Sequence, residues 1–290
     1  MAEKADTIKT KIISFAQESP QNRMPTPDKD IIFSEPLVQF ADGDDSIFSE
    51  YKGIIDPEHM TPREALAKAY DKNPNDLPAR LSVISWILPI TEKTRVSNRN
   101  ETRVPSRLWS HTRWYGEIFN NTLREYTADY LVEKGYMATA PMMTPHFKML
   151  STDRGFCSNW SERHIAYATG LGTFSLSDGF ITENGIAHRC GSVVTDLELP
   201  SSPRTATGPY ANCLFHANEN CGKCIKRCPA EAITEQGHDK DKCGQYLRDI
   251  GYSPQQLASG YDLETSVAGC GLCQTGVPCE AENPTHNSKK

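Results

Sequence analysis

The chain has 290 residues, a formal net charge of −6 and a sequence pI of about 5.8. Its charges are interspersed without a long basic run, so the composition argues against a general nucleic-acid binder. The first 20 residues contain neither an apolar signal core nor a twin arginine, and no apolar run reaches the length of a membrane span. We therefore expect a cytoplasmic protein without a membrane partner.

Residues 1–75 are expected to form an extended, partly helical N-terminal lead-in with several proline spacers. The sequence T-P-R-E that starts at Thr61 predicts a helix start. The threonine can cap the helix, proline suits the first helical position and the glutamate completes a capping box. Residues 82–88, S-V-I-S-W-I-L, are mostly apolar and end at Pro89, which predicts a buried strand.

The strongest helix signal in the chain covers residues 114–134. Apolar side chains recur there every three or four residues, and Gly135 stands where a C-terminal cap belongs. A strand is predicted at 136–140. A second helix is predicted at 161–169, where it stops before a G-L-G sequence.

Two further strands are predicted at 180–182 and 191–195, joined as a hairpin by a turn around Asn184-Gly185. Alternating helices and strands indicate an α+β fold with an α/β layer domain over 76–200. A stretch rich in Ser, Pro, Thr and Gly follows and predicts a linker. A smaller domain at 201–290 is expected to complete the chain.

Eight of the ten cysteines lie in the last third of the chain. Residues 221–229 read C-G-K-C-I-K-R-C-P, the C-x2-C-x3-C-P end of a bacterial ferredoxin motif, and 270–273 add a second C-x2-C pair. Eight clustered thiols match two [4Fe–4S] clusters with four ligands each, in a bacterial ferredoxin-like domain. Zinc is the main alternative, but zinc ribbons do not need a Cys-Pro step, and a cytosolic location disfavours disulfides.

The cysteine spacing suggests how the thiols divide. The cysteine before proline usually ligates the other cluster, so Cys228 is expected to cross over. The usual motif has a cysteine three residues before Cys221, where this chain has asparagine, so Cys213 is the nearest upstream candidate. One predicted cluster uses Cys213, Cys221, Cys224 and Cys279, and the other uses Cys228, Cys243, Cys270 and Cys273. The alternative is a single cluster with unligated thiols. Cys157 and Cys190 are expected to be buried and inert.

Two parts of the sequence resemble known families. Residues 161–172, S-E-R-H-I-A-Y-A-T-G-L-G, are continued by V-T-D-L-E-L at 194–199. The cysteine order includes K-C-G-Q-Y-L at 242–247 and C-G-L-C-Q at 270–274. This pattern resembles the epoxyqueuosine reductases and, more distantly, the corrinoid-dependent reductive dehalogenases. The resemblance covers about residues 150–280.

This resemblance implies a nitroreductase-like domain that holds a base-off cobalamin, with two clusters passing on electrons from an external ferredoxin- or flavodoxin-type donor. Reduction by cob(I)alamin needs a protein acid, for which Asp153 is the candidate. The alternative is a solvated loop aspartate paired with Arg154. Gly170, Leu171 and Gly172 are the candidate cofactor-binding residues, because glycines let a planar cofactor approach the backbone. Glycines there also suit a helix C-cap.

The resemblance does not identify the substrate. Residues 173–178 read T-F-S-L-S-D where the reductases have W-I-G-K-N-T. The acidic balance argues against a tRNA substrate, and the missing twin arginine argues against an exported dehalogenase. The main hypothesis is an iron–sulfur and corrinoid reductase of a small molecule, with no nucleic-acid partner. The alternatives are a cluster-only electron-transfer protein and a redox partner that reactivates corrinoid proteins.

Overall fold

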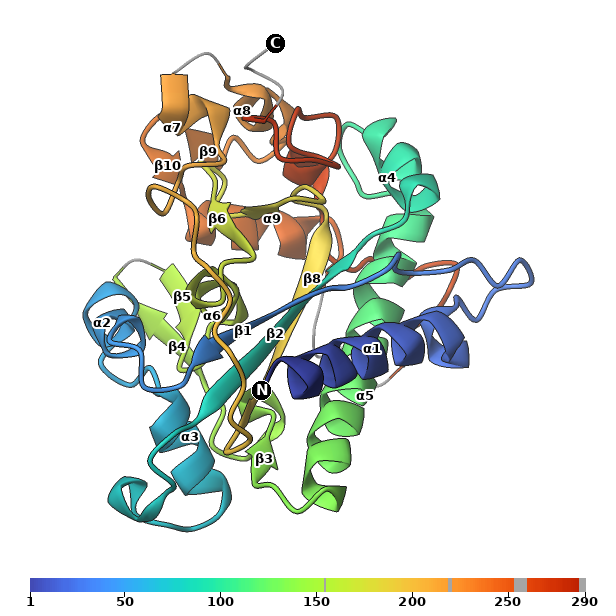
Figure 1. The fold of residues 1–290 in the computed structure, drawn as a ribbon. Helices are drawn as coiled ribbons and strands as arrows, with labels where there is room; N and C mark the ends of the chain where they lie inside the picture. The colour runs from blue at the N-terminus through green and yellow to red at the C-terminus, as the bar shows by residue number, and fades with distance from the viewer. Residues whose placement is uncertain (154, 219–220, 253–259, 287–290) are drawn as a thin grey trace.

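The computed structural model describes residues 1–153, 155–218, 221–252 and 260–286. Within these ranges, a four-stranded antiparallel sheet has the strand order β1-β2-β8-β3 (Figure 1). Its strands are β1 (Leu37–Asp42), β2 (Ser82–Pro89), β8 (His188–Thr195) and β3 (Ala138–Thr139). The register pairs Leu37 with Ile87 on one side of β2 and Ser82 with Thr195 on the other.

Helices cover both faces of this sheet, which explains why β2 is an almost uninterrupted apolar run. Successive side chains of a strand point to opposite faces. Ile84 and Trp86 pack in one core with α1 (Ala2–Glu18) and α5 (Arg107–Glu133). Val83 packs in a second core with α2 (Ile47–Ile54), α3 (Pro62–Ala69) and α6 (Glu162–Ala168). Figure 1 shows α1 and α5 on one side of the sheet and α2 and α3 on the other.

Several predicted elements are confirmed. β2 contains the predicted buried strand. α5 contains the strongest predicted helix but begins earlier, because the hydroxyl of Ser106 caps it by accepting a hydrogen bond from the Trp109 N–H at 3.1 Å. Gly135 follows that helix with a φ of +87°. Thr61 and Glu64 form the expected capping box at the start of α3.

The predicted hairpin around Asn184-Gly185 is wrong. β7 (Phe180–Thr182) pairs with β6 (Gly172–Phe174), whereas β8 pairs with β2 and β3 of the central sheet. A tight turn does form, since Thr182 and Gly185 make an isolated bridge. Val193 and Val194 of β8 are fully buried in the central sheet, and this burial outweighs the local preference for pairing across the turn.

The first 75 residues belong to the same layers as the rest of the sheet. β1 lies at the sheet edge and pairs with β2 along its whole length, and α1 packs against α5 through Phe15, whose ring stacks on Tyr126 at 4.1 Å between centroids. The expected lead-in therefore supplies a strand and three helices to the core.

The remaining elements lie around this core. They are α4 (Glu92–Arg99), β4 (Met149–Thr152), β5 (Gly155–Ser158), α7 (Leu214–Asn218), α8 (Lys223–Arg227), β9 (Ile233–Thr234), β10 (Gly237–His238), α9 (Lys240–Asp249) and 3-10 helices at Pro20–Asn22, Pro74–Asp76, Pro141–Met143 and Leu272–Gln274. The C-terminal elements gather at one end of the sheet, near α4 (Figure 1). Across the described ranges, none of the helices combines the length and apolar character required to span a membrane.

Candidate functional site: two thiol groups beside a cleft

Four of the predicted cluster ligands line one small, apolar cavity. The thiols that meet there are those of Cys213, Cys221, Cys224 and Cys279. Cys213 is buried directly before α7, and Cys279 belongs to the segment after the last 3-10 helix. Burial raises the pKa of Cys224 to about 11, and the neighbouring thiols of Cys213 and Cys221 contribute to the rise. The structure thus gathers the four thiols that the spacing predicts for one cluster.

The other four predicted ligands form a second group next to the first. Burial raises the pKa of Cys270 to about 11, and the thiols of Cys243 and Cys228 contribute to this rise. Burial also raises the pKa of Cys273, and a lesser contribution comes from Cys224 of the first group. The thiols therefore lie within electrostatic range of one another, and the two groups are adjacent.

Two groups of four sulfur donors have the chemistry of [4Fe–4S] ligation, in which each cluster is held by four cysteine thiolates. No three His, Cys, Asp or Glu side chains of the described residues converge as ligands of one metal ion would. The first group of thiols instead surrounds a space, as ligands of a multi-atom cluster must. Burial and neighbouring thiols raise the pKa of Cys224 and of Cys279, and binding to iron would offset the cost of ionising these two thiols. The donor set therefore fits the expected clusters.

Charged side chains tie the thiol-bearing loops to one another and to α4. Arg227 directly precedes a cysteine of the second group and donates to the carbonyl oxygens of Thr275 at 2.9 Å and Glu101 at 2.8 Å. Glu280 directly follows the last cysteine of the chain, and its carboxylate accepts hydrogen bonds from Arg99 at 2.6 and 3.1 Å. These contacts hold the loops in place through protein groups alone.

A cleft of about 920 Å³ lies beside the first thiol group. Gly170, Leu171 and Gly172, the predicted cofactor-binding residues, all line it. Other walls come from β1, from residues 204–207 and from Asn212, which directly precedes a cysteine of the first group. The three predicted residues are thus brought together in one wall of this cleft.

Close backbone packing explains why glycine occupies positions 170 and 172. Gly170 follows α6 with a φ of +81°, and a Cβ atom there would lie 2.6 Å from the carbonyl oxygen of Pro203. At Gly172 a Cβ atom would lie 2.3 Å from the carbonyl oxygen of Ile181. The helix-cap alternative therefore accounts for Gly170, and close strand pairing accounts for Gly172. Both glycines shape the wall of the cleft.

Asp153 lies in the turn between β4 and β5, where it is exposed. The described residues that line the 920 Å³ cleft do not include it. The hairpin instead packs beside α9, since a Cβ atom on Gly155 would lie 2.9 Å from the Cβ of Lys240. Asp153 is thus near the helix that carries Cys243. The alternative pairing with Arg154 lies outside the described residues.

Glu162, the first residue of the E-R sequence at 162–163, belongs to a buried ion-pair network. Arg124 of α5 is 1% exposed and pairs with Glu162 at 3.2 Å and with Glu117 at 2.9 Å. The hydroxyl of Ser192 donates a further hydrogen bond to Glu162 at 2.6 Å. Burial alone would lower the pKa of Arg124, but the two carboxylates raise it. Sequence reasoning missed Arg124, because nothing local marks a polar residue whose partner is on another helix.

Cys157 and Cys190 lie outside both thiol groups. Cys190 is on β8 and packs against a buried cluster that includes Leu171 and Phe180, and burial raises its pKa to about 12. Cys157 is on β5, and partial burial also raises its pKa. The prediction that both cysteines are buried is wrong, because each residue is partly exposed. A raised pKa disfavours the reactive thiolate, so these surroundings suit unreactive thiols.

Comparisons with known proteins give sequence relatives among the reductive dehalogenases. The chain is 32% identical over 117 residues to tetrachloroethene reductive dehalogenases of Dehalobacter restrictus and Desulfitobacterium hafniense. The match covers 40% of this chain and 20% of theirs, so the chain matches about a fifth of the length of these curated relatives. The predicted resemblance to this group is confirmed over that stretch. No family model matches the chain.

Similar solved structures include epoxyqueuosine reductases. One, from Bacillus subtilis, has a TM-score of 0.47 and 16% identity, and another, with an epoxyqueuosine-modified tRNA-Tyr stem loop, has a TM-score of 0.48 and 17% identity. Each comparison covers 95% of this chain and 66% of the other one.

Proposed function

We propose that this chain is a reductase in which two [4Fe–4S] clusters pass electrons to a corrinoid that reduces a small-molecule substrate. The observation that carries the proposal is the gathering of eight cysteines into two adjacent groups of four, beside a cleft lined by Gly170, Leu171 and Gly172. The similarity to tetrachloroethene reductive dehalogenases supports reductive chemistry.

Each part of the chain has a role in this proposal. Residues 1–75 lead into and complete the sheet, 76–200 form a nitroreductase-like cobalamin domain, and 201–290 form a ferredoxin-like domain with two clusters. The clusters take electrons one at a time from an external donor of the ferredoxin or flavodoxin type. The cofactor, when bound, supplies a strongly reducing metal centre for a two-electron reduction.

The residues of the chain bind, orient and supply protons. The eight cysteines hold the clusters, and Ile181 and Val277 help to keep water from the first group. The Gly170–Gly172 backbone forms a wall of the corrinoid site. Asp153 is the proposed proton donor. Because it lies in the turn of a short hairpin, this role requires the hairpin to approach the substrate.

A small molecule is the favoured substrate class. One similar structure carries a tRNA stem loop, whereas the net charge of this chain is −6 and its charges form no long basic run. A nucleic-acid ligand demands neutralisation of many phosphates, which this charge balance does not favour. A cluster-only electron-transfer protein and a redox partner that reactivates corrinoid proteins are the other outcomes of the tests below.

The cluster assignment is tested by iron analysis of anaerobically reconstituted protein. We expect about eight iron atoms per chain, and about four after Cys279→Ser in the first group or Cys273→Ser in the second. Cys157→Ser is the matched control, since that thiol lies outside both groups, and it should keep all the iron. If Cys279→Ser and Cys273→Ser both retain the full iron content, the assignment of eight ligands is wrong.

The role of Asp153 is tested by turnover with tetrachloroethene as the probe and a reduced viologen as the donor. Asp153→Asn should keep the iron and the corrinoid but lose turnover at least tenfold, which is at the low end for a general acid. Asp28→Asn, in an N-terminal loop, is the charge-matched control. Unchanged turnover of Asp153→Asn would eliminate this proton donor.

A further inference from the structure

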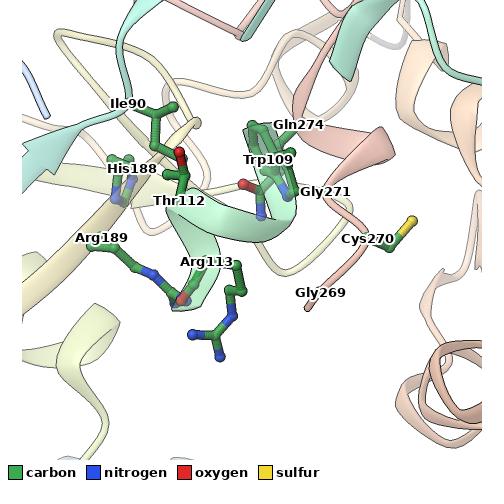
Figure 2. A pocket seen from close by; sticks show the side chains of 10 residues that line it. All are labelled: Ile90, Trp109, Thr112, Arg113, His188, Arg189, Gly269, Cys270, Gly271 and Gln274. Atoms are coloured by element: carbon green, nitrogen blue, oxygen red, sulfur yellow. The ribbon is translucent and has the colours of Figure 1, made fainter. Parts of the chain in front are cut away.

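A further cavity, of about 140 Å³, is lined in part by Cys270 of the second thiol group. We call it the arginine pocket, and the residues that define it here are Trp109, Thr112, Arg113, His188, Arg189 and Cys270. Four segments line it, namely the first turns of α5, the start of β8, the loop that carries Cys270, and Ile90 directly after β2 (Figure 2).

The wall next to Cys270 is held rigidly. Gly271 has a φ of +65°, and a Cβ atom there would lie 2.0 Å from the indole of Trp109. The indole is therefore in direct contact with the backbone of the cysteine loop. The carbonyl oxygen of Cys270 also accepts a hydrogen bond from the Asn98 side chain at 3.4 Å. A ligand in the arginine pocket would consequently meet a preformed site.

Two guanidinium groups bring many hydrogen-bond donors to this pocket and use few of them. A guanidinium carries five N–H donors. The guanidinium of Arg113 makes no hydrogen bond to another described residue, and its distance to the carboxylate of Glu117 is 3.7 Å. Arg189 lies 3.5 Å from the same carboxylate and donates one hydrogen bond, at 3.4 Å, to the carbonyl oxygen of Arg113. In Figure 2 the side chain of Arg189 extends toward Arg113.

The charges around the pocket leave an excess of positive charge. Glu117 is shared by Arg113, Arg189 and the buried Arg124, and Arg124 also pairs with Glu162. Within this ion-pair network three cations and two carboxylates leave a net charge of +1, and Arg163 adds a further positive charge within electrostatic range of His188.

Of the other polar groups, His188 is not a cation. Its Nε2 donates to the carbonyl oxygen of Phe180 at 2.7 Å, its Nδ1 faces the sulfur of Cys190 at 3.6 Å, and burial lowers its pKa to about 4. Gln274 adds an uncharged amide to the lining. The positive charge of the site is therefore that of the two arginines.

We propose that the arginine pocket binds the carboxylate of a small organic acid next to the loop of Cys270. A planar carboxylate matches the fork of a guanidinium and can accept from both arginines. The volume admits a molecule of a few heavy atoms, and the excess of positive charge favours an anion. The site does not depend on the proposed cofactors, since neither cysteine group supplies its donors.

Saturation-transfer NMR on the anaerobically purified full-length protein tests this inference at constant ionic strength. The probe is propionate, with propionamide as its uncharged analogue and inorganic phosphate as the competing anion. We expect saturable propionate binding with a dissociation constant on the order of 1 mM, and no saturable propionamide binding. Arg189→Gln and Arg113→Gln should each weaken propionate binding at least tenfold.

Arg248→Gln on α9 is the charge-matched control and should bind propionate like the unaltered protein. Arg113→Lys keeps the positive charge but loses the guanidinium fork. This variant should retain part of the propionate affinity and the melting temperature of the unaltered protein, which separates loss of the site from loss of the fold. No saturable propionate binding, equal binding of propionamide, tighter binding of phosphate, or unaltered affinity in both glutamine variants would each overturn the inference.

Discussion

Replacing Glu280 by glutamine should loosen the segment that carries the last cysteine of the first thiol group. The carboxylate is 4% exposed and accepts hydrogen bonds from Arg99 at 2.6 and 3.1 Å and from the backbone N–H of Gly276 at 2.7 Å. Arg95 lies 3.5 Å from it. An amide keeps the shape and one acceptor, but it removes the charge that holds two arginines of α4.

The size of the effect follows from the burial of the partners. Breaking a fully buried ion pair costs about 3–5 kcal/mol, and an exposed pair contributes below about 1 kcal/mol. The side chain of Glu280 is buried but that of Arg99 is 47% exposed, so we expect a loss of about 2 kcal/mol in the free energy of unfolding.

This loss should depend on pH. Burial alone would raise the pKa of Glu280, but Arg99 and the Gly276 N–H lower it below its usual value. A carboxyl whose folded pKa is lowered stabilises the protein above its unfolded pKa of about 4.3, and this contribution is lost as pH falls through the folded value. The difference between Glu280→Gln and the unaltered protein should therefore be full at pH 7 and shrink below about pH 4.

Anaerobic urea unfolding followed by tryptophan fluorescence measures this difference, and iron release to a chelator reports on the neighbouring cysteine. Glu280→Gln should unfold at lower urea and release iron faster. Glu235→Gln, an exposed carboxylate after β9, is the matched control and should behave like the unaltered protein. Equal unfolding midpoints and equal iron release in both variants would refute the assignment of Glu280 as the anchor of this segment.

Three further predictions concern the core and the second thiol group. Gly271→Ala should destabilise the protein by at least about 2 kcal/mol and lower its iron content, because the new methyl group meets the indole of Trp109 and the φ of +65° is strained for alanine. Arg124→Met should cost about 3–5 kcal/mol in urea unfolding, since it leaves the carboxylate of Glu162 buried without its cation. His59 is fully buried, and burial lowers its pKa to about 4, so the unfolded state takes up a proton first as pH falls from about 6.5 to 4. That linkage should remove up to about 3 kcal/mol of stability, measured by urea unfolding across this range.

Each of these predictions has a control and a contradicting result. Gly53→Ala, in a helix where a Cβ atom meets nothing within 4 Å, should leave stability unchanged or raise it, and an equal loss in both glycine variants would remove the steric argument. Arg248→Met tests loss of an exposed arginine and should cost below about 0.5 kcal/mol. For the histidine, His59→Gln should flatten the slope of stability between pH 4 and 6.5, and an unchanged slope would assign it to other groups.

Repeating patterns of apolar residues predicted the main helix and the central strand. The mostly apolar sequence of β2 indicates a strand buried on both faces, and the apolar stripe before Gly135 indicates α5. The four thiols predicted for the first cluster, including Cys213, line one cavity, whereas their role as cluster ligands stays a prediction. Local patterns of this kind report on a residue and its near neighbours.

Other features depend on long-range packing and could not be predicted from local sequence patterns. The turn at Asn184-Gly185 predicts a hairpin, but the valines of β8 find a better apolar environment beside β2 than across the turn. The arginine pocket and the ion pair of Arg124 with Glu162 join segments far apart in sequence. The local sequence around Arg124 does not show that its partner lies on another helix. The positions of Asp153 and of the cleft likewise depend on how whole elements pack.

Titration of the anaerobically reconstituted protein with cobalamin, followed by visible absorption, tests the central claim most directly. We expect saturable binding of one corrinoid per chain, a shift to the base-off spectrum, and reduction of the bound cobalt when a low-potential donor is added. Iron–sulfur absorption that stays unaltered on adding cobalamin, with no bound corrinoid after gel filtration, would contradict the account and leave an electron-transfer protein.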